Sequence, residues 1–350
     1  MLIHNQHYRT VWYDRQSNVV SLIDQRKLPF QLEILHCKDY RETAAAIAHM
    51  AVRGAGAIGA TAGFAMAQAF VSLKDEGAIT KARLLIEATR PTAVNLFHAT
   101  QKVYMAGLES VQQAGKAAQD WADADARMCQ SIGEYGNTLL PDDARVLTHC
   151  NAGWLAFVDY GSALSPVYTA KQAGKSPFVY VDETRPRGQG ARLTAYELFH
   201  NGIAHKIIAD NAAAFYMARG EVDLVITGAD RIAANGDVAN KIGTLEKAIL
   251  AKEFGLPFYV AAPFSTFDFN ADSGASIPIE ERADEELLYH EGPDEEGVMR
   301  KIRMAAPGCR GLNPAFDVTS SQYITAFITD RGIFKPSELH ALKTDTAAEG

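Results

Sequence analysis

The stretch HKIIADNAAAFYMARGEVDLVITGAD, residues 205–230, decides the fold class of the second half of the chain. Two strand-like runs, 205–210 and 222–230, enclose a helix-like segment at 212–221. This order predicts two parallel strands joined by a right-handed helical crossover. Because the strand-like runs are apolar, we expect a sheet that is covered on both faces.

The same alternation continues on both sides of this stretch, after a change of rhythm at the PDDA sequence, residues 141–144. It predicts a C-terminal α/β domain over residues 141–350 with a parallel sheet. The further strand-like runs are RVLTHC (145–150), FVYVDE (178–183) and LPFYVAAP (256–263).

The first part of the chain has a different pattern. Residues 7–36 alternate like short strands with turns, whereas residues 40–140 carry apolar side chains at helical spacing. We therefore predict an N-terminal domain, residues 1–140, that consists of a small sheet and a helical bundle.

Composition excludes several classes of protein. The 350 residues carry a formal net charge of −8, which disfavours a surface for nucleic acid or acidic lipid. The four cysteines form no CxxC pair, which argues against a zinc ribbon or a disulfide framework and fits a reducing cytoplasm. We recognise no signal peptide and no apolar run of the roughly 20 residues that span a bilayer.

Polar residues follow each strand-like run, and parallel strands place their carboxyl ends at one edge of a sheet, where ligands bind. We expect these residues to converge there: Cys150 and Asn151, Asp182 and Glu183, Asp210 and Asn211, Gly228 to Arg231, and Pro263.

Two glycine- or proline-containing turns in the N-terminal half are candidates for anion binding. MAVRGAGAIGA, residues 50–60, places Arg53 and small residues before a helix expected near Ala57, where backbone N–H groups attract an anion. A plain helix-helix turn explains it equally well. In ATRPTAVNLFHA, residues 88–99, Pro91 is expected in the first helical turn with Arg90 before it; an ordinary surface arginine is the alternative.

Two loops of the second half are richer in polar groups. VDETRPRGQGARLTAYEL, residues 181–198, contains Gln189 between two glycines, and we interpret it as a ligand-lining loop. GADRIAANGDVANKIGT, residues 228–244, is expected to place Asn240 and Lys241 at the start of a helix, where an oxyanion is stabilised.

Cys150 is expected near a helix N-terminus, a setting that lowers the pKa of a thiol, although most lone cysteines are inert core residues. The adjacent His149 should point to the opposite side of the extended chain, so a Cys-His dyad is not expected. No histidine pair has metal-ligand spacing, and YHEGPDEEG, residues 289–297, is interpreted as a solvated acidic loop.

Together these segments resemble the aldose-1-phosphate isomerase branch of the initiation-factor-2B-like superfamily, nearly from end to end. The segments that carry the resemblance are SLIDQRKLP, VRGAGAIG, RPTAVNL, LTHCNAG, ETRPRGQGARLTAYEL, TGADRIAANGDVANKIGT, PFYVAAPFSTFD, IPIEER and NPAFDVT.

The resemblance implies a C-terminal Rossmann-like doubly wound domain, a homodimer, a sugar phosphate as substrate, and no metal or nucleotide cofactor. It implies that Cys150 and Asp230 serve catalysis, with Asp230 as an acid that needs an apolar setting. The residues that it implies for binding substrate and phosphate are Arg53, Gly54, Ala55, Arg90, Gln189, Asn240 and Lys241.

The implied reaction converts a 5-substituted ribose 1-phosphate, most closely 5-methylthioribose 1-phosphate, to the ribulose 1-phosphate in methionine salvage. Related substrates, 5-deoxyribose 1-phosphate and ribose 1,5-bisphosphate, stay open, as does a non-catalytic regulatory subunit of the same fold. Cys150 would act as a base in an enediol route or stabilise charge in a hydride-shift route.

Four residues depart from the pattern usual in the family: Gly56, Trp154, Gly188 and Asn211. Trp154, four residues after Cys150, would either reshape the pocket for the 5-substituent or lie on a packed face.

Overall fold

The computed structural model describes residues 1–91 and 93–339, which form two compact units. Unit 1 comprises residues 1–134, 152–169 and 200–202, and unit 2 comprises the rest of the chain. Unit 1 contains small sheets and a group of helices, and unit 2 contains a large, mostly parallel sheet, so the predicted fold class is confirmed. The units interleave along the chain, and a division into domains at residue 140 stays a prediction.

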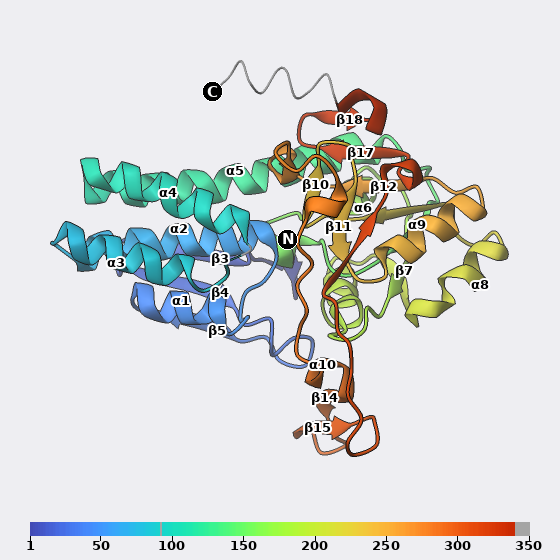
Figure 1. Ribbon diagram of the computed structural model, residues 1–350, viewed down its shortest axis with the longest axis horizontal. Helices are drawn as coiled ribbons and strands as arrows, with labels where there is room; N and C mark the ends of the chain where they lie inside the picture. Colours follow the sequence, from blue (N-terminus) through green and yellow to red (C-terminus); the bar gives the residue numbers. More distant parts are fainter. Residues whose placement is uncertain (92, 340–350) are drawn as a thin grey trace. The chain divides into compact units, whose positions relative to one another are not determined.

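Unit 1 contains antiparallel strands followed by five helices, of which α5 ends in unit 2 (Figure 1). The strands pair as β1-β2 and as β3-β4-β5. Their bounds are β1 (Leu2–Ile3), β2 (Gln6–His7), β3 (Val11–Asp14), β4 (Val19–Ile23) and β5 (Ile34–Cys37); those of the helices are α1 (Tyr40–Ala48), α2 (Ala55–Ser72), α3 (Glu76–Glu87), α4 (Val94–Glu109) and α5 (Val111–Asn137).

Helix α2 is the core of unit 1 and packs against α1, α3 and α4. It is apolar on all faces, as expected for a helix that is enclosed by others. Its one long polar side chain inside the core, Gln68, is fully buried and donates to the carbonyl oxygens of Asn18 and Cys37, at 2.8 and 2.9 Å. Gln68 also accepts from the Thr43 hydroxyl at 2.6 Å, so this side chain ties α2 to α1 and to the sheet.

By length and composition α2 is also a candidate for crossing a membrane, the one such helix among the described residues. Within unit 1, however, 83% of its residues are buried. The helix therefore reads as the core helix of a packed unit.

The large sheet of unit 2 has the strand order β18-β17-β12-β9-β6-β7-β8. Six strands are parallel and β18 is antiparallel at one edge, so the order counted from β6 is 3-2-1-4-5-6, typical of doubly wound sheets. The strands are β6 (Arg145–Thr148), β7 (Phe178–Asp182), β8 (Ala204–Ile208), β9 (Leu224–Thr227), β12 (Phe258–Ala261), β17 (Ala326–Thr329) and β18 (Gly332–Phe334); the helices between successive strands are α6 (Ser165–Gln172), α7 (Ala195–His200), α8 (Ala213–Ala218) and α9 (Thr244–Glu253).

Two smaller sheets complete unit 2. One has the order β13-β10-β11-β16, and the other is the hairpin β14-β15, which projects from unit 2 next to α10 (Figure 1). The elements are β10 (Arg231–Ala233), β11 (Val238–Lys241), β13 (Phe267–Asp268), α10 (Glu285–Leu288), β14 (Tyr289–Pro293), β15 (Met299–Arg303) and β16 (Phe316–Thr319). Residues 289–297, predicted as an acidic loop, thus contain strand β14 and its turn, because the chain pairs with β15.

Candidate active site

The loops after β6, β7 and β8 meet at the carboxyl-terminal edge of the large sheet, as the sequence predicted. Thr184, after β7, donates its N–H to Asp210 Oδ1 after β8, at 2.7 Å. The Thr184 hydroxyl in turn accepts from the N–H of Cys150, after β6, at 2.8 Å. A chain of hydrogen bonds therefore connects three neighbouring strand ends.

Cys150 has a left-handed backbone conformation, with φ of 66°, that residues other than glycine rarely adopt. Besides the bond from its N–H to Thr184, its carbonyl oxygen accepts from the Thr194 hydroxyl at 2.8 Å. These two threonines hold a half-buried thiol on a backbone that is fixed from both sides.

The prediction that Cys150 lies near a helix N-terminus is wrong. The next helical residues, Trp154–Ala156, form a single 3-10 turn, and they belong to unit 1. An apolar run after a glycine satisfied the helical pattern, but residues 157–164 continue mostly in bends. Their neighbours bond to other segments, as when the Thr10 hydroxyl donates to Trp154 O at 2.8 Å.

His149 is buried, and both ring nitrogens have partners other than Cys150. Nδ1 lies 2.8 Å from Asp182 Oδ2, and Nε2 lies 2.8 Å from the carbonyl oxygen of Ile242. The expectation that His149 and Cys150 form no dyad is confirmed by this geometry.

The loop with Gln189 leads into an unusual helix. Gln189 precedes a π-helical segment, Gly190–Thr194, and such segments are frequent at functional sites. The Gln189 side chain is buried, and its Oε1 has no hydrogen-bond partner among the described residues. A buried acceptor without a partner is costly, so this amide is suited to a ligand donor.

The residues expected at a helix start, Asn240 and Lys241, instead end strand β11, and two residues separate the strand from α9, which begins at Thr244. Pairing of β11 with both β10 and β16 extends the strand to Lys241. Asn240 donates to the Thr244 hydroxyl at 3.0 Å, and the Lys241 ammonium donates to Ala315 O at 2.9 Å.

Asp230 directly precedes β10, and its N–H donates to Ala239 O at 3.0 Å. Its side chain is exposed, so the described structure does not give it the apolar setting that was predicted.

The remaining predicted residues lie in unit 1. Gly54 precedes α2 with φ of 87°, and a Cβ there would lie 2.3 Å from Ala156 O, so only glycine fits. Helix α2 begins at Ala55 instead of Ala57, and its positive end follows Arg53 and Gly54. Helix α4 begins at Val94, so Pro91 precedes the helix instead of lying in its first turn, and Arg90 lies before the helix as predicted.

Three of the four unusual residues have a structural explanation. Trp154 is fully buried, which favours the packed-face alternative. At Gly56 a Cβ would lie 2.2 Å from Asp125 Oδ1 and 2.5 Å from Phe157 Cδ1, so a side chain there would force these buried side chains to move. Gly188 has φ of 68°, a conformation suited to glycine. Nothing in the structure explains Asn211.

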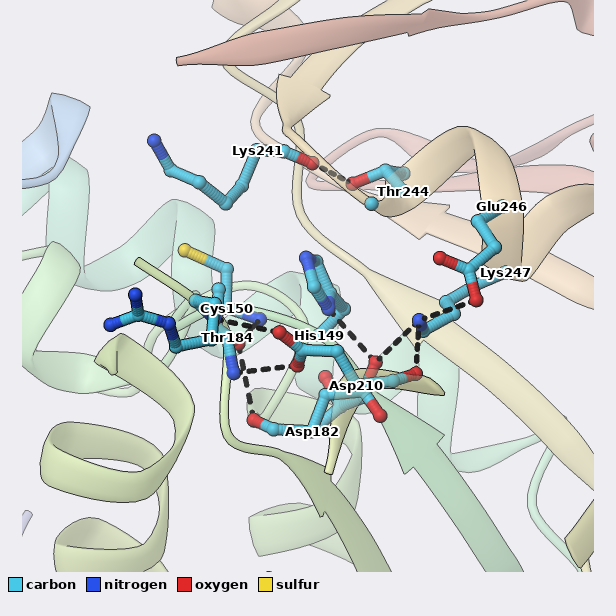
Figure 2. A network of polar contacts seen from close by, with 12 residues as sticks. His149, Cys150, Asp182, Thr184, Asp210, Lys241, Thr244, Glu246 and Lys247 are labelled. Carbon is cyan, nitrogen blue, oxygen red and sulfur yellow. Dashed lines mark hydrogen bonds and ion pairs between the residues drawn. The ribbon is translucent and has the colours of Figure 1, made fainter. Parts of the chain in front are cut away.

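Among the described residues, one group of side chains has ligand atoms close enough for a metal ion. Atoms of His149, Asp182 and Asp210 all lie within 4.8 Å of one another. However, the Lys247 ammonium lies 3.5 Å from Asp182 Oδ2 and 2.6 Å from Asp210 O (Figure 2). Because a cation already pairs with this carboxylate, we interpret the group as a hydrogen-bonded network.

Sequence reasoning missed Thr184, Thr194 and Lys247. The signal for Lys247 was its spacing, because the buried face of α9 contains Thr244, Lys247, Ala248 and Ala251, at helical steps of three and four. A lysine on such a face is rarely buried without a partner. The threonines carried no signal, since their roles depend on segments distant in sequence.

Comparisons with known proteins extend over both units. The model of the initiation factor 2 subunit family matches residues 47–336. A methylthioribose-1-phosphate isomerase of Chloroflexus aurantiacus is 48% identical over 349 residues, which cover 96% of this chain and 97% of that protein. Methylthioribose-1-phosphate isomerase 1 of Pseudothermotoga lettingae is 47% identical, covering 94% of this chain and 96% of that protein.

Solved structures give the same picture. The 5-methylthioribose 1-phosphate isomerase from Pyrococcus horikoshii OT3 is 41% identical, with a TM-score of 0.87 over 98% of this chain and 97% of that chain. The translation initiation factor eIF-2B, subunit delta, from A. fulgidus is 39% identical, with a TM-score of 0.85 over 96% of this chain and 99% of that one. The likeness therefore covers nearly the whole chain.

Proposed function

Because the chain belongs to the initiation factor 2 subunit family, and within it to the methylthioribose-1-phosphate isomerases, we propose that it converts 5-methylthioribose 1-phosphate to 5-methylthioribulose 1-phosphate. The main support for this proposal is a sequence identity of 48%, over 96% of the chain, to a methylthioribose-1-phosphate isomerase. Such an aldose–ketose isomerase would act in methionine salvage.

Cys150 and Asp230 are the proposed catalytic residues, and the substrate and its phosphate are bound by Arg53, Gly54, Ala55, Arg90, Gln189, Asn240 and Lys241. The fixed backbone of Cys150 and the buried acceptor of Gln189 support these roles. The strand order of the large sheet supports a Rossmann-like domain, with the loops after its strands as the binding edge.

The chemistry of this isomerisation explains why the site needs an acid and a second catalytic group. A sugar with phosphate on its anomeric oxygen does not open spontaneously to an aldehyde. Asp230 gives a proton to the ring oxygen as the bond from C1 to that oxygen breaks. A hydrogen then moves from C2 to C1, and the 2-hydroxyl group returns a proton to the Asp230 carboxylate as the carbonyl group forms at C2. The product keeps the phosphate on C1 and has a carbonyl group at C2.

Two routes for the hydrogen differ in the role of Cys150. In an enediol route a thiolate removes the proton from C2, and a proton is returned to C1. In a hydride-shift route the hydrogen moves with its electron pair, and Cys150 stabilises charge. Turnover in deuterated water separates them: deuterium bound to C1 of the ketose supports the enediol, and its complete absence supports the hydride shift.

The function is tested with purified protein and three sugar phosphates: 5-methylthioribose 1-phosphate, 5-deoxyribose 1-phosphate and ribose 1,5-bisphosphate. Ketose formation fastest with the first supports the proposal, and no ketose with any of them contradicts it. Saturable binding without turnover would instead support a regulatory subunit of this fold.

The catalytic roles are tested with two variants and matched controls. Cys150→Ser and Asp230→Asn should fold normally and lose turnover, whereas Cys309→Ser and Asp272→Asn change an exposed cysteine and an exposed aspartate and should keep it. Near-normal rates in either of the first two variants would contradict the assignment.

The proposal also includes a homodimer in the cytoplasm that uses no metal or nucleotide cofactor and binds no nucleic acid or membrane. Light scattering during size-exclusion chromatography measures the mass of the protein in solution, which should be that of a dimer. Full activity after dialysis against a chelator is the expected result for a metal-independent enzyme.

A further inference from the structure

Glu197, on α7, has a fully buried carboxyl group that the reaction proposed above does not use. Its Oε1 accepts a hydrogen bond of 2.8 Å from the side-chain amide of Asn151, the residue that follows Cys150 in the chain. The same amide nitrogen donates to the hydroxyl oxygen of Thr194 at 3.1 Å. Because an amide nitrogen can only donate, Asn151 joins two buried acceptors, one on each of these residues.

Thr194 continues this chain of hydrogen bonds to Cys150. A hydroxyl group has one proton to donate, and that of Thr194 goes to the carbonyl oxygen of Cys150 at 2.8 Å. The peptide unit that links Cys150 to Asn151 is therefore held at two points. Thr194 holds its carbonyl oxygen, and Glu197 holds the side chain of the residue that follows.

The two acceptors belong to one helical face that is attached to the large sheet. Thr194 and Glu197 are three residues apart, a spacing that places two side chains on the same side of a helix. Thr194 is the last residue of the π-helical segment Gly190–Thr194. The first residue of this segment is in close contact with the end of β7, since a Cβ at Gly190 would lie 1.7 Å from Asp182 O. The face therefore offers Asn151 partners with a fixed position.

The backbone of Cys150 needs support of this kind. Its φ of 66° lies in the left-handed region, and a residue other than glycine keeps such a conformation only where its surroundings hold it. Thr184 accepts from the N–H of Cys150 on one side (Figure 2), and Thr194 donates to its carbonyl oxygen on the other. If the second bond is lost, the peptide unit after Cys150 can rotate toward a more usual conformation, and the thiol moves with it.

We propose that Glu197 is a positioning residue that acts through Asn151 and Thr194 to keep Cys150 in its left-handed conformation, and so keeps the thiol in place for the reaction. The inference rests on the proposed function for the catalytic role of Cys150.

The test is a double-mutant cycle in which kcat and KM are measured with 5-methylthioribose 1-phosphate. Glu197→Met keeps the length of the side chain and removes the acceptor, whereas Glu197→Gln keeps an acceptor of the same reach. Thr194→Val removes the hydroxyl group with little change of shape. The matched control is Lys175→Met, before the start of β7, which removes bonds from the ammonium to Asn137 O at 2.9 Å and Leu140 O at 2.6 Å.

Glu197→Met and Thr194→Val should each lower kcat about tenfold, the equivalent of one hydrogen bond, and leave KM within about twofold of the wild type. Because both changes break the same chain of bonds, the double variant should lie within about threefold of either single variant, whereas independent effects would multiply to about a hundredfold. Glu197→Gln and Lys175→Met should keep kcat within about threefold of the wild type. The proposal is overturned by an unchanged kcat in Glu197→Met, by independent effects in the double variant, or by a full loss in Glu197→Gln or Lys175→Met.

A failure of the proposed function is distinguished by a second readout. If the wild type converts no sugar phosphate, the cycle is repeated with the rate of iodoacetamide alkylation at Cys150, measured by mass spectrometry of its peptide. Each single variant should then change the rate by at least about threefold, and the double variant should change it no further. Unchanged rates in the single variants overturn the positioning role whether or not the protein is an isomerase.

If Glu197→Met does not fold, Asn151→Ser replaces it in the cycle, with the same expected and overturning results, because it removes the amide that joins the two acceptors. If neither variant folds, crystals of the wild type soaked with 5-methylthioribulose 1-phosphate decide. A left-handed Cys150 that still accepts from Thr194 supports the proposal, and loss of either feature overturns it.

Discussion

Asp125, on α5, has a buried carboxyl group whose charge should make unit 1 less stable as the pH rises. Its Oδ2 accepts a hydrogen bond of 2.7 Å from the N–H of Val158. Burial raises the pKa of Asp125 from 3.8 to about 7; the bond from Val158 opposes the rise and the charge of Asp159 adds to it. The carboxyl group is therefore neutral in the folded protein at mildly acidic pH, where the unfolded chain is ionised.

The sign and size of the effect follow from proton linkage. The folded state binds the proton of Asp125 more tightly than the unfolded state does. Protonation of Asp125 therefore stabilises the folded protein fully below about pH 4, and this stabilisation is lost as the pH rises to about 7. At about 1.4 kcal/mol per pKa unit, the difference between 3.8 and about 7 corresponds to roughly 4 kcal/mol. Above about pH 7 Asp125 is ionised in both states, and the free energy of unfolding is lower by this full amount than it is below about pH 4.

Asp125→Asn removes the ionisable group and keeps an oxygen that accepts from Val158. Urea unfolding, followed by tryptophan fluorescence from about pH 4 to pH 8, should show the variant gaining roughly 4 kcal/mol relative to the wild type across this range. Asp120→Asn, an exposed change on the same helix, should show no such gain. If the free energies of unfolding of wild type and Asp125→Asn differ by the same amount at every pH, the carboxyl group of Asp125 is not neutral in the folded protein and the reasoning is refuted.

Three further substitutions test the packing and the loops. Gln68→Leu leaves a hydroxyl and two carbonyl groups in the core of unit 1 without their partner, and urea unfolding should show a loss of about 2–4 kcal/mol. Gly190→Ala places a Cβ 1.7 Å from a backbone carbonyl oxygen, so KM for the sugar phosphate should rise at least about tenfold, whereas Gly292→Ala, in open space, should leave it unchanged. Thr184→Val removes the acceptor for the N–H of Cys150. In a stopped assay of ketose formation kcat should fall about tenfold, which corresponds to the free energy of one hydrogen bond. An unchanged kcat would show that this bond does not position the thiol.

Local patterns in the sequence were sufficient for five of the seven strands of the large sheet, all except β17 and β18, and for the edge where its polar residues gather. The strands β6, β7, β9 and β12 fall within the predicted runs, and β8 begins one residue before its run, because apolar, β-branched residues favour strands. The loops after β6, β7 and β8 meet as predicted, since parallel strands share the direction of their carboxyl ends.

Predictions failed where distant segments decide the local structure. Asn240 and Lys241 lie in a strand because β16, more than 70 residues away along the chain, pairs with β11. The backbone after Cys150 forms only a single 3-10 turn, and the backbone N–H and carbonyl groups of Cys150 bond to Thr184 and Thr194 from other segments. Periodicity within a short window contains no information on such partners.

The sequence by itself determined the fold class, the family and the loops that carry the candidate residues, because these depend on residue patterns that are local or shared with relatives. Only the tertiary structure decided the electrostatic setting of those residues. The exposed Asp230, the buried acceptor of Gln189 and the ammonium of Lys247 beside Asp182 all depend on which segments cover a side chain. Desolvation and pairing act through space, so neighbours in the folded protein, not neighbours in the chain, set the charge of each group.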